Sequence, residues 1–232
     1  MKKITLLLLT FLVTVTFAFS SEVFFPTSVG TVMLTANKNS NGRVEGYTRI
    51  AVKDVRVSGN DMTVVYGAQI LDRNQRPINN RPEREYSVNI SNGVLMFRLE
   101  GTMEAYFTSR RMNYTMTAGS LPIPSTLSPG SRIADTWMKI DVSVPVIGTV
   151  TANVAITNIV CAGIETVTVP AGTFEAYKVT QITTTKTTGW NVPTVVNTGV
   201  TWYVKGLGSV KFVSYDDKGK VESSTELLEL QR

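Results

Sequence analysis

Apolar and polar residues alternate along much of the chain after residue 20. From position 138 to 144 the even-numbered residues are Met, Ile, Val and Val, whereas the odd-numbered residues are Lys, Asp and Ser. Segments 86–90 and 200–205 repeat this period of two. In the segment 150–160, one face is expected to hold Val150, Ala152, Val154, Ile156 and Val160. Alternation rich in β-branched residues is typical of antiparallel strands that bury one face, so the chain is predicted to be all-β.

Turn signals separate these runs at the spacing of hairpins. Asn-Gly, Gly-Asn and Lys-Gly pairs supply the positive φ that tight hairpins need. The short turns are expected at 39–42, 58–61, 91–93, 147–148 and 216–219. Two longer loops are expected at 72–82 and 119–130. The second loop divides the chain near its middle and leaves about five strand candidates on each side.

Long strands bear on how the sheet closes. A strand from 44 to 57 would extend ~46 Å at about 3.3 Å per residue. Antiparallel sheets with many long strands twist strongly and close into a barrel or fold into two layers. We therefore predict a mainly antiparallel sheet of about ten strands that is either barrel-like or a two-layer curled sheet. The hydropathy pattern does not distinguish a barrel from a two-layer sheet.

The first twenty residues have the three parts of a secretory signal peptide. A basic start, Met1-Lys2-Lys3, precedes an apolar run at 4–19, and small residues stand before an expected cut at Ser21. The run is shorter than the about 20 residues of a spanning helix, and no later window is apolar enough to span a membrane. We expect residues 1–20 to be removed and 21–232 to form a single all-β domain, with its two halves joined by the loop 119–130. The product is expected in the periplasm, secreted or on the cell surface.

Composition excludes several kinds of chemistry. The 232 residues include no histidine and one cysteine, Cys161, so imidazole catalysis, Cys/His zinc sites and internal disulfides are excluded. No cofactor or metal is expected. The formal net charge of +5 falls to +3 without the two lysines of the signal peptide, and the remaining charges are spread out. Nucleic acid is therefore not an expected partner.

Catalysis by carboxylates is the enzymatic alternative that remains, because paired acids can hydrolyse glycosides without histidine. The candidate pairs are Glu83 with Glu85, Glu100 with Glu104, and Asp135 with Asp141. Strand alternation places many such acids on a solvent-exposed face of the sheet. The sequence also contains no Gly-x-Ser-x-Gly nucleophile motif. We therefore interpret the protein as a non-enzyme. Cys161 is interpreted as a buried, inert thiol, since no neighbour in sequence would lower its pKa.

Four segments carry a family resemblance. Residues 167–179 contain Pro-Ala-Gly-Thr-Phe-Glu-Ala-Tyr-Lys-Val, and residues 202–211 read Trp-Tyr-Val-Lys-Gly-Leu-Gly-Ser-Val-Lys. Segments 121–135 and, more weakly, 25–31 add to them. Together they resemble the TapB / DUF3108-like group of exported proteins, common in Bacteroides-type bacteria, over most of the mature chain. The resemblance implies an all-β periplasmic or surface protein of poorly defined function, and it brings no catalytic residues.

The same motifs have a plain structural interpretation. Pro170 and Gly172 would form a tight connection between a strand ending at Val169 and the next strand. Gly206 and Gly208 would allow a bend or bulge, and Trp202 would anchor a core.

A cluster of methionines and aromatic residues is the candidate ligand site. Its members are Met96, Met103, Tyr106, Phe107, Met112, Tyr114 and Met116. Methionine adapts to varied apolar partners, and a curled sheet leaves an interior to line, although ordinary core filling is the alternative. The loop 72–84 also holds four arginines. They would suit an anionic glycan or lipid headgroup, or simply a solvated loop.

Two main functions follow from the sequence. The first is a binding or carrier module for a lipid or other apolar or amphipathic small molecule in the cell envelope. The second is a structural or assembly protein that acts through a surface shared with an envelope protein. A carboxylate-dependent hydrolase is a third, less supported hypothesis.

Overall fold

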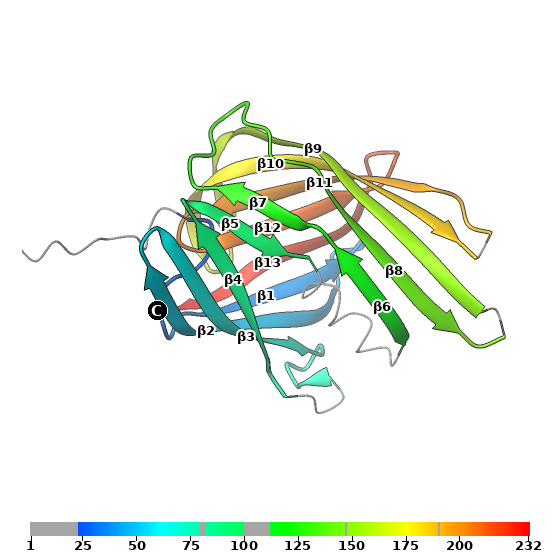
Figure 1. Ribbon diagram of the computed structural model, residues 1–232, viewed down its shortest axis with the longest axis horizontal. Helices are drawn as coiled ribbons and strands as arrows, with labels where there is room; N and C mark the ends of the chain where they lie inside the picture. Colours follow the sequence, from blue (N-terminus) through cyan, green and yellow to red (C-terminus); the bar gives the residue numbers. More distant parts are fainter. Residues whose placement is uncertain (1–22, 79–81, 100–111, 147, 190) are drawn as a thin grey trace, which may run out of the picture.

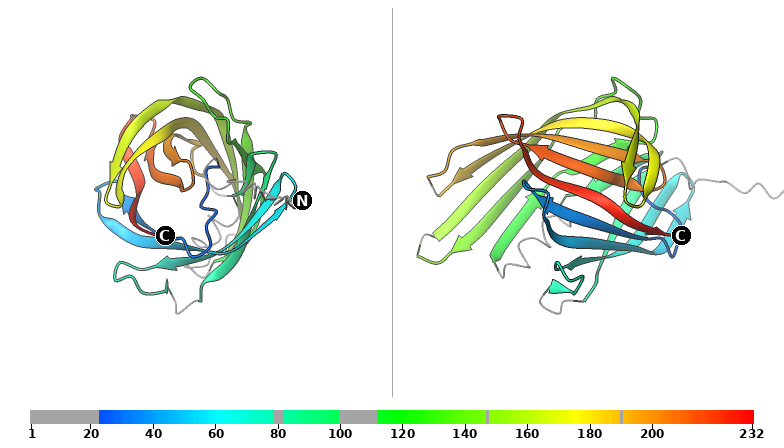
Figure 2. Two further views of the ribbon diagram at one scale, coloured as in Figure 1. Left: turned by 90° about the vertical axis from the view of Figure 1, so that its left-hand side faces the viewer. Right: turned by 180° about the vertical axis from the view of Figure 1, so that it is seen from behind.

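A computed structural model describes residues 23–78, 82–99, 112–146, 148–189 and 191–232. Within these residues thirteen antiparallel strands form one sheet, more than the about ten expected. The strands are β1 (Val32–Asn39), β2 (Val44–Ser58), β3 (Asp61–Leu71), β4 (Arg84–Ser91), β5 (Val94–Arg98), β6 (Asn113–Ala118), β7 (Ser120–Pro124), β8 (Thr136–Val144), β9 (Gly148–Val169), β10 (Gly172–Thr188), β11 (Val195–Val204), β12 (Gly208–Tyr215) and β13 (Val221–Gln231). The sheet curls into a nearly closed barrel (Figures 1 and 2).

The barrel closes through one continuous segment of chain. The sheet order begins at β6, which pairs with β8, and ends at β7, which pairs with β5. Gly119 alone separates β6 from β7, and its N–H donates to the carbonyl of Trp137 at 2.9 Å. A side chain at Gly119 would stand 2.8 Å from Oγ1 of Thr136. The two ends of the sheet order are thus joined at a glycine.

The strand β7 corrects the expectation of a loop throughout 119–130. Its two prolines, Pro122 and Pro124, suggested a loop because proline cannot donate a ladder hydrogen bond. Here they oppose Met96 and Val94 of β5. An end strand tolerates proline, since one of its sides needs no ladder bond.

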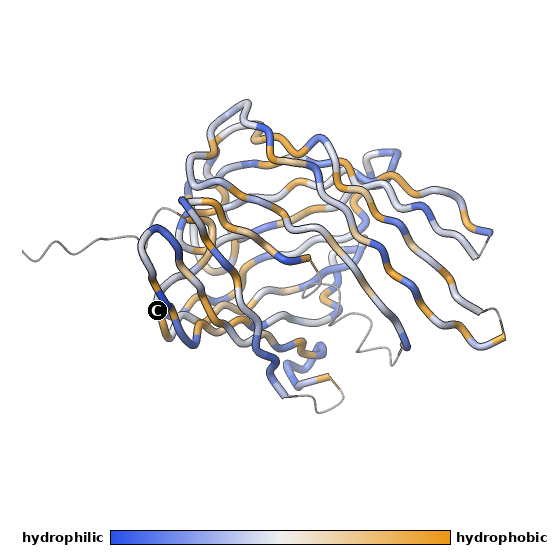
Figure 3. The backbone as a smooth tube through the Cα atoms, in the orientation of Figure 1, coloured by the Kyte–Doolittle hydropathy of each residue, from blue (hydrophilic) through white to orange (hydrophobic). Residues whose placement is uncertain are grey.

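Alternation in sequence becomes alternation between the two faces of the wall, visible as changes of colour along each strand in Figure 3. Met138, Ile140 and Val142 are buried in the main core, as the pattern predicts. The prediction was wrong at Val160. Asn158 has a φ of 52°, and the pairing of β9 with β10 shifts register beside it. This bulge changes the phase of the strand, so Ile159 and Cys161 enter the core instead.

The N-terminal segment fills one end of the barrel. Residues 23–25 run inside the wall (Figure 2), and the Phe24 side chain is 1% exposed. The ring of Phe24 lies edge-on to Tyr177 at 5.0 Å between centroids and 6.0 Å from Tyr203. Phe25 lies 5.2 Å from Tyr66. We call residues 23–25 the plug.

A second core lies where the β9–β10 hairpin meets β11–β13 and β1. It buries residues of all these strands, among them Val169, Ala176, Trp202 and Leu227. The N–H of Ala171, in the turn of the hairpin, donates to the carbonyl of Leu227 at 3.2 Å. The hairpin tip is therefore fixed to β13, two strands beyond its neighbour β11 in the sheet order. In the described part of the chain no helix is long and apolar enough to cross a membrane.

Candidate functional site

The candidate site is the inner face of the barrel beyond the plug. The wall is uneven there, because β9 has 22 residues and β10 has 17, whereas β1 and β12 have 8 each. The longer strands extend past the shorter ones (Figure 1). We call the part of the barrel that lies beyond Ile156 and Thr183, as seen from Phe24, the distal half.

One side of the distal half is apolar. Its inner positions are Tyr114, Met116 and Ala118 on β6, Met138, Ile140 and Val142 on β8, and Val150, Ala152 and Val154 on β9. Register places Met116, Ile140 and Ala152 in one row across the three strands. Ile140 is buried, and Met116 and Ala152 are half-buried against the main core. These strands form a continuous apolar wall.

The other side of the distal half is polar. Following the same rows across the sheet, Ile156 is opposite Thr183, which is opposite Asn197 of β11. The Asn197 amide Nδ2 donates to Oγ of Ser214 at 3.4 Å and also to the Glu222 carboxylate. Its Oδ1 is buried and has no hydrogen-bond partner among the groups that the structure describes. A buried acceptor without a partner costs about 1–3 kcal/mol.

Polar inner positions continue beyond β11. Asn37 of β1 is opposite Thr225 of β13, and its Nδ2 donates to Oγ1 of Thr48 at 3.2 Å. Thr225 in turn is opposite Phe212 of β12. The inner face therefore changes between β9 and β10 from aliphatic groups to mainly hydroxyl and amide groups, with Val195 and Phe212 as apolar exceptions.

The methionine and aromatic cluster expected from the sequence is placed in three different ways. Tyr114 and Met116 lie on the apolar wall, and Met112 packs against the same core. Met96 is 37% exposed, because β5 turns its neighbour Leu95 inward. The remaining members, Met103, Tyr106 and Phe107, lie outside the described residues.

The two family motifs meet in space. Trp202 is buried in the second core, and its indole Nε1 donates to Oε1 of Glu165 at 2.7 Å. This bond, together with Lys178, holds the pKa of the Glu165 carboxyl below its usual range. Lys178 of the first motif and Lys211 of the second place their ammonium groups 5.6 and 5.4 Å from the Trp202 ring.

The glycines of these motifs fix backbone contacts. Pro170 and Gly172 bound the β9–β10 turn, where Gly172 has a φ of 144°. Gly206 has a φ of 74°, and its N–H donates to the carbonyl of Val23 at 2.7 Å. A side chain at Gly208 would come within 3.0 Å of the Phe24 carbonyl oxygen. Both glycines therefore hold the plug in place.

The acidic residues considered for hydrolysis make structural interactions. Glu83 pairs with Arg49 at 2.8 Å and with Lys53 at 2.7 Å. Hydrogen bonds from Thr151 and from Lys139 hold the pKa of Asp141 below its usual range. The pKa shift of Asp141 is thus the opposite of the raised pKa that a glycosidase acid needs.

The other acids of the candidate pairs give no further sign of such a site. Asp135 accepts the Asn158 N–H at 3.2 Å. Glu85 is exposed. Glu100 and Glu104 lie outside the described residues. Among the residues described, no three metal-ligating side chains come together.

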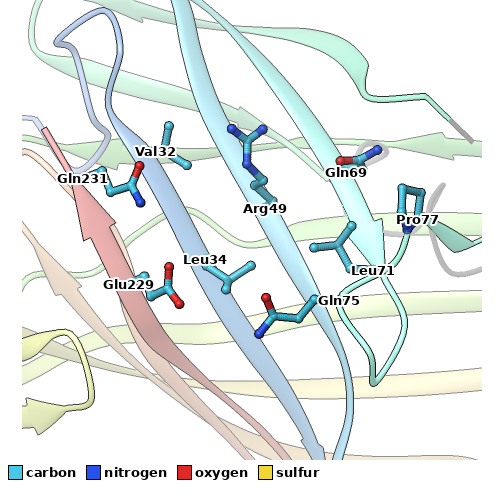
Figure 4. A pocket seen from close by; sticks show the side chains of 9 residues that line it. All are labelled: Val32, Leu34, Arg49, Gln69, Leu71, Gln75, Pro77, Glu229 and Gln231. Carbon is cyan, nitrogen blue, oxygen red and sulfur yellow. The ribbon is translucent and has the colours of Figure 1, made fainter.

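Two hollows open on the outer face of the barrel. One, of about 410 Å³, crosses β13, β1, β2 and β3 (Figure 4). The other, of about 540 Å³, lies over β6, β8 and β9 beside Lys139 and Asp141. Neither was foreseen from the sequence, because their residues come together only through strand register.

Comparison with known proteins gives a family and a fold. Residues 28–227 match the model of the family described as DUF3108-like. A structure from Bacteroides fragilis, provisionally described as an exported protein with a YmcC-like fold, has a TM-score of 0.74 at 18% identity, covering 90% of this chain and 99% of the other. One from Parabacteroides distasonis, provisionally described as a lipoprotein, has a TM-score of 0.75 at 20% identity, with 90% and 98% covered. At these identities the likeness shows the fold alone. None of the curated proteins compared matches this chain.

Proposed function

This chain belongs to the DUF3108-like family, and we propose that it binds an amphipathic molecule of the cell envelope in the distal half of its barrel, without catalysis. The observation that carries the proposal is the division of one inner face into an apolar wall and a polar wall. A molecule with an acyl or other apolar part would lie along β6, β8 and β9. Its polar end would face β10 and β11.

Asn197 is the residue that selects the polar end. Its Oδ1 is buried without a partner among the described groups. A hydroxyl or amide donor of the ligand would remove this cost. A purely apolar ligand would leave it in place, so the site favours amphipathic molecules over hydrocarbons.

The place of action proposed is the periplasm or the cell surface. The signal-peptide pattern at 1–20 supports export, and the solved neighbours are described as an exported protein and a lipoprotein. The narrower grouping with TapB proteins rests on the motifs around Pro170 and Trp202, and it forms part of the proposal.

Solvent extraction tests the proposal directly. Protein purified from the envelope of the producing cells is extracted with organic solvent, and the extract is analysed by mass spectrometry. We expect a lipid or other amphipathic molecule in near-stoichiometric amount, and displacement of an apolar fluorescent dye by it. An empty extract together with no dye uptake would overturn the proposal.

A matched pair of variants ties binding to the polar wall. Asn197→Leu should weaken binding of a lysophospholipid about tenfold, the equivalent of one hydrogen bond of about 1.4 kcal/mol. Asn191→Leu, at an exposed position of the β10–β11 connection, should leave the affinity unchanged.

A second candidate function is envelope assembly through a protein surface. It is favoured by exposed valines: Val146 and Val192 in the β8–β9 and β10–β11 connections, and Val195 and Val196 at the start of β11. The β10–β11 connection lies beside the start of β9, since a side chain on Gly189 would come 2.4 Å from the Thr149 carbonyl oxygen. Pull-down from envelope extracts separates the two functions. A stoichiometric protein partner that is lost on Val192→Ser supports assembly, and a bound small molecule supports carriage.

A further inference from the structure

The outer groove of Figure 4 has the size and floor of a ligand site. It crosses four strands on the face opposite to Met33 and Ile50, and it holds about 410 Å³. Small-molecule sites usually hold about 300–1,000 Å³. Leu34, Leu71 and Pro77 supply an apolar floor, and strand register places Leu34 beside Arg49.

Planar polar groups surround this floor. They are the guanidinium of Arg49, the amides of Gln69, Gln75 and Gln231, and the carboxylate of Glu229. Four of these five sit on β13, β2 and β3, so the sheet fixes their spacing. The fifth, Gln75, comes from the turn after β3, and its side chain points from that turn toward Leu34 (Figure 4).

The turn that carries Gln75, at 72–76, recurs at 39–43 and 216–220. In each, the N–H of the first residue, an Asp or Asn, donates to the carbonyl of the fifth, and its own carbonyl accepts the N–H of the fourth. The side-chain oxygen of the first residue accepts the N–H groups of the third and fifth at 2.8–3.1 Å. The three turns are therefore equivalent positions within one chain.

The fourth residue of each turn has a positive φ. This φ is 73° at Gly42 and 75° at Gly219. The turn at 72–76 has Gln75 in the same position, with a φ of 59°. Glycine adopts this region freely, whereas a residue with a Cβ is disfavoured. A glycine would be the more stable choice at 75, as at the other two positions. Unfavourable backbone conformations of this kind gather at ligand sites.

From these two observations we propose that the groove binds a neutral saccharide, and that Gln75 is retained to present its amide to it. An amide offers donors and an acceptor in one plane, which matches neighbouring hydroxyl groups. The C–H face of a sugar ring would pack on Leu34 and Leu71. This site is separate from the distal half and does not depend on the function proposed for it.

The groove suits a saccharide better than a peptide or an ion. Its central strands, β1 and β2, are each paired on both sides, so they offer no free edge for an added strand. Its one guanidinium, on Arg49, pairs with Glu83 at 2.8 Å, and its one carboxylate is that of Glu229. The lining therefore has no excess charge of either sign.

Affinity and stability measured together test the proposal. Soluble α- and β-linked hexose and N-acetylhexosamine oligosaccharides are titrated into the full-length protein and followed by calorimetry. We expect saturable binding of at least one class. Gln75→Gly should reduce that affinity at least tenfold while raising the melting temperature by about 2–4 °C, because strain is relieved.

The chain supplies its own controls. Gly42→Gln places the same side chain in an equivalent turn away from the groove, so it should lower the melting temperature and leave saccharide affinity unchanged. Gln231→Ala removes a groove amide without touching any of these turns, and it should weaken binding. The proposal is overturned if no oligosaccharide binds, or if Gln75→Gly binds as well as the parent protein.

Discussion

The ammonium group of Lys211 lies 5.4 Å from the ring of Trp202, the residue directly opposite it on the neighbouring strand. Lys178 approaches the same ring from β10, and Glu165 of β9 accepts the indole N–H. A single row of side chains thus ties four strands together. The row joins the segments 167–179 and 202–211, two of the four that carry the family resemblance.

Removing the indole should destabilise the protein strongly. Trp202→Ala is expected to lower the free energy of unfolding by about 3–5 kcal/mol, because a buried aromatic ring is lost. Lys211→Met keeps the aliphatic stem and should cost only about 0.5–1 kcal/mol. Urea unfolding measures both values. Equal losses in the two variants would contradict this account of the row.

The plug should be a structural part of the barrel. Phe24→Ala is expected to cost about 3–5 kcal/mol, since the ring contacts Tyr177 and Tyr203 inside the wall. Val29→Ala, at an exposed position a few residues later, should change stability by less than about 0.5 kcal/mol. Thermal unfolding of both variants checks this, and a Phe24→Ala protein as stable as the control would show that the plug is dispensable.

Two buried tyrosines should make stability depend on alkaline pH. Burial raises the pKa of Tyr203 to about 12, and burial together with nearby Tyr86 raises that of Tyr66 to about 12. The unfolded chain loses these protons near pH 10, so their contribution is fully present below pH 10 and is lost as pH rises toward 12. Absorbance of tyrosinate should show Tyr66 and Tyr203 among the late-titrating groups. Tyr66→Phe and Tyr203→Phe should each remove part of the alkaline loss.

Cys161 should be inert in the native protein. Its side chain is fully buried, and desolvation raises the pKa of the thiol. Because the thiolate is the reactive form, iodoacetamide at pH 8 should label the protein only in denaturant. Rapid labelling without denaturant would mean that β9 opens at this position.

Much of the strand pattern was readable from the sequence, because an inner and an outer face impose a period of two. The segment 138–144 shows this most clearly, since its apolar positions are those of the apolar wall. The pattern failed where local geometry overrides it. The bulge at Asn158 reverses the faces after Ile156, and nothing in the composition of that segment marks it.

Contacts between residues far apart in the sequence were harder to predict than the strands themselves. The prolines of β7 were interpreted as loop residues, because only the sheet order shows that this strand needs pairing on one side. Only Phe25 of the plug belongs to the weak motif at 25–31, and the position of the plug inside the barrel depends on contacts with residues 150 or more positions away. The polar wall and the outer groove are products of register across many strands, which a single sequence does not specify.

Methyl NMR during a lipid titration tests the central claim most directly. Lysophosphatidylethanolamine, kept below its micelle concentration, is added to the protein labelled at Ile, Val and Met methyl groups. We predict saturable shifts at Met116, Ile140 and Val154 on the apolar wall, and none at Val29, which is exposed in the segment before β1. Shifts confined to the outer methyl groups, or no shifts at any concentration, would contradict binding in the distal half.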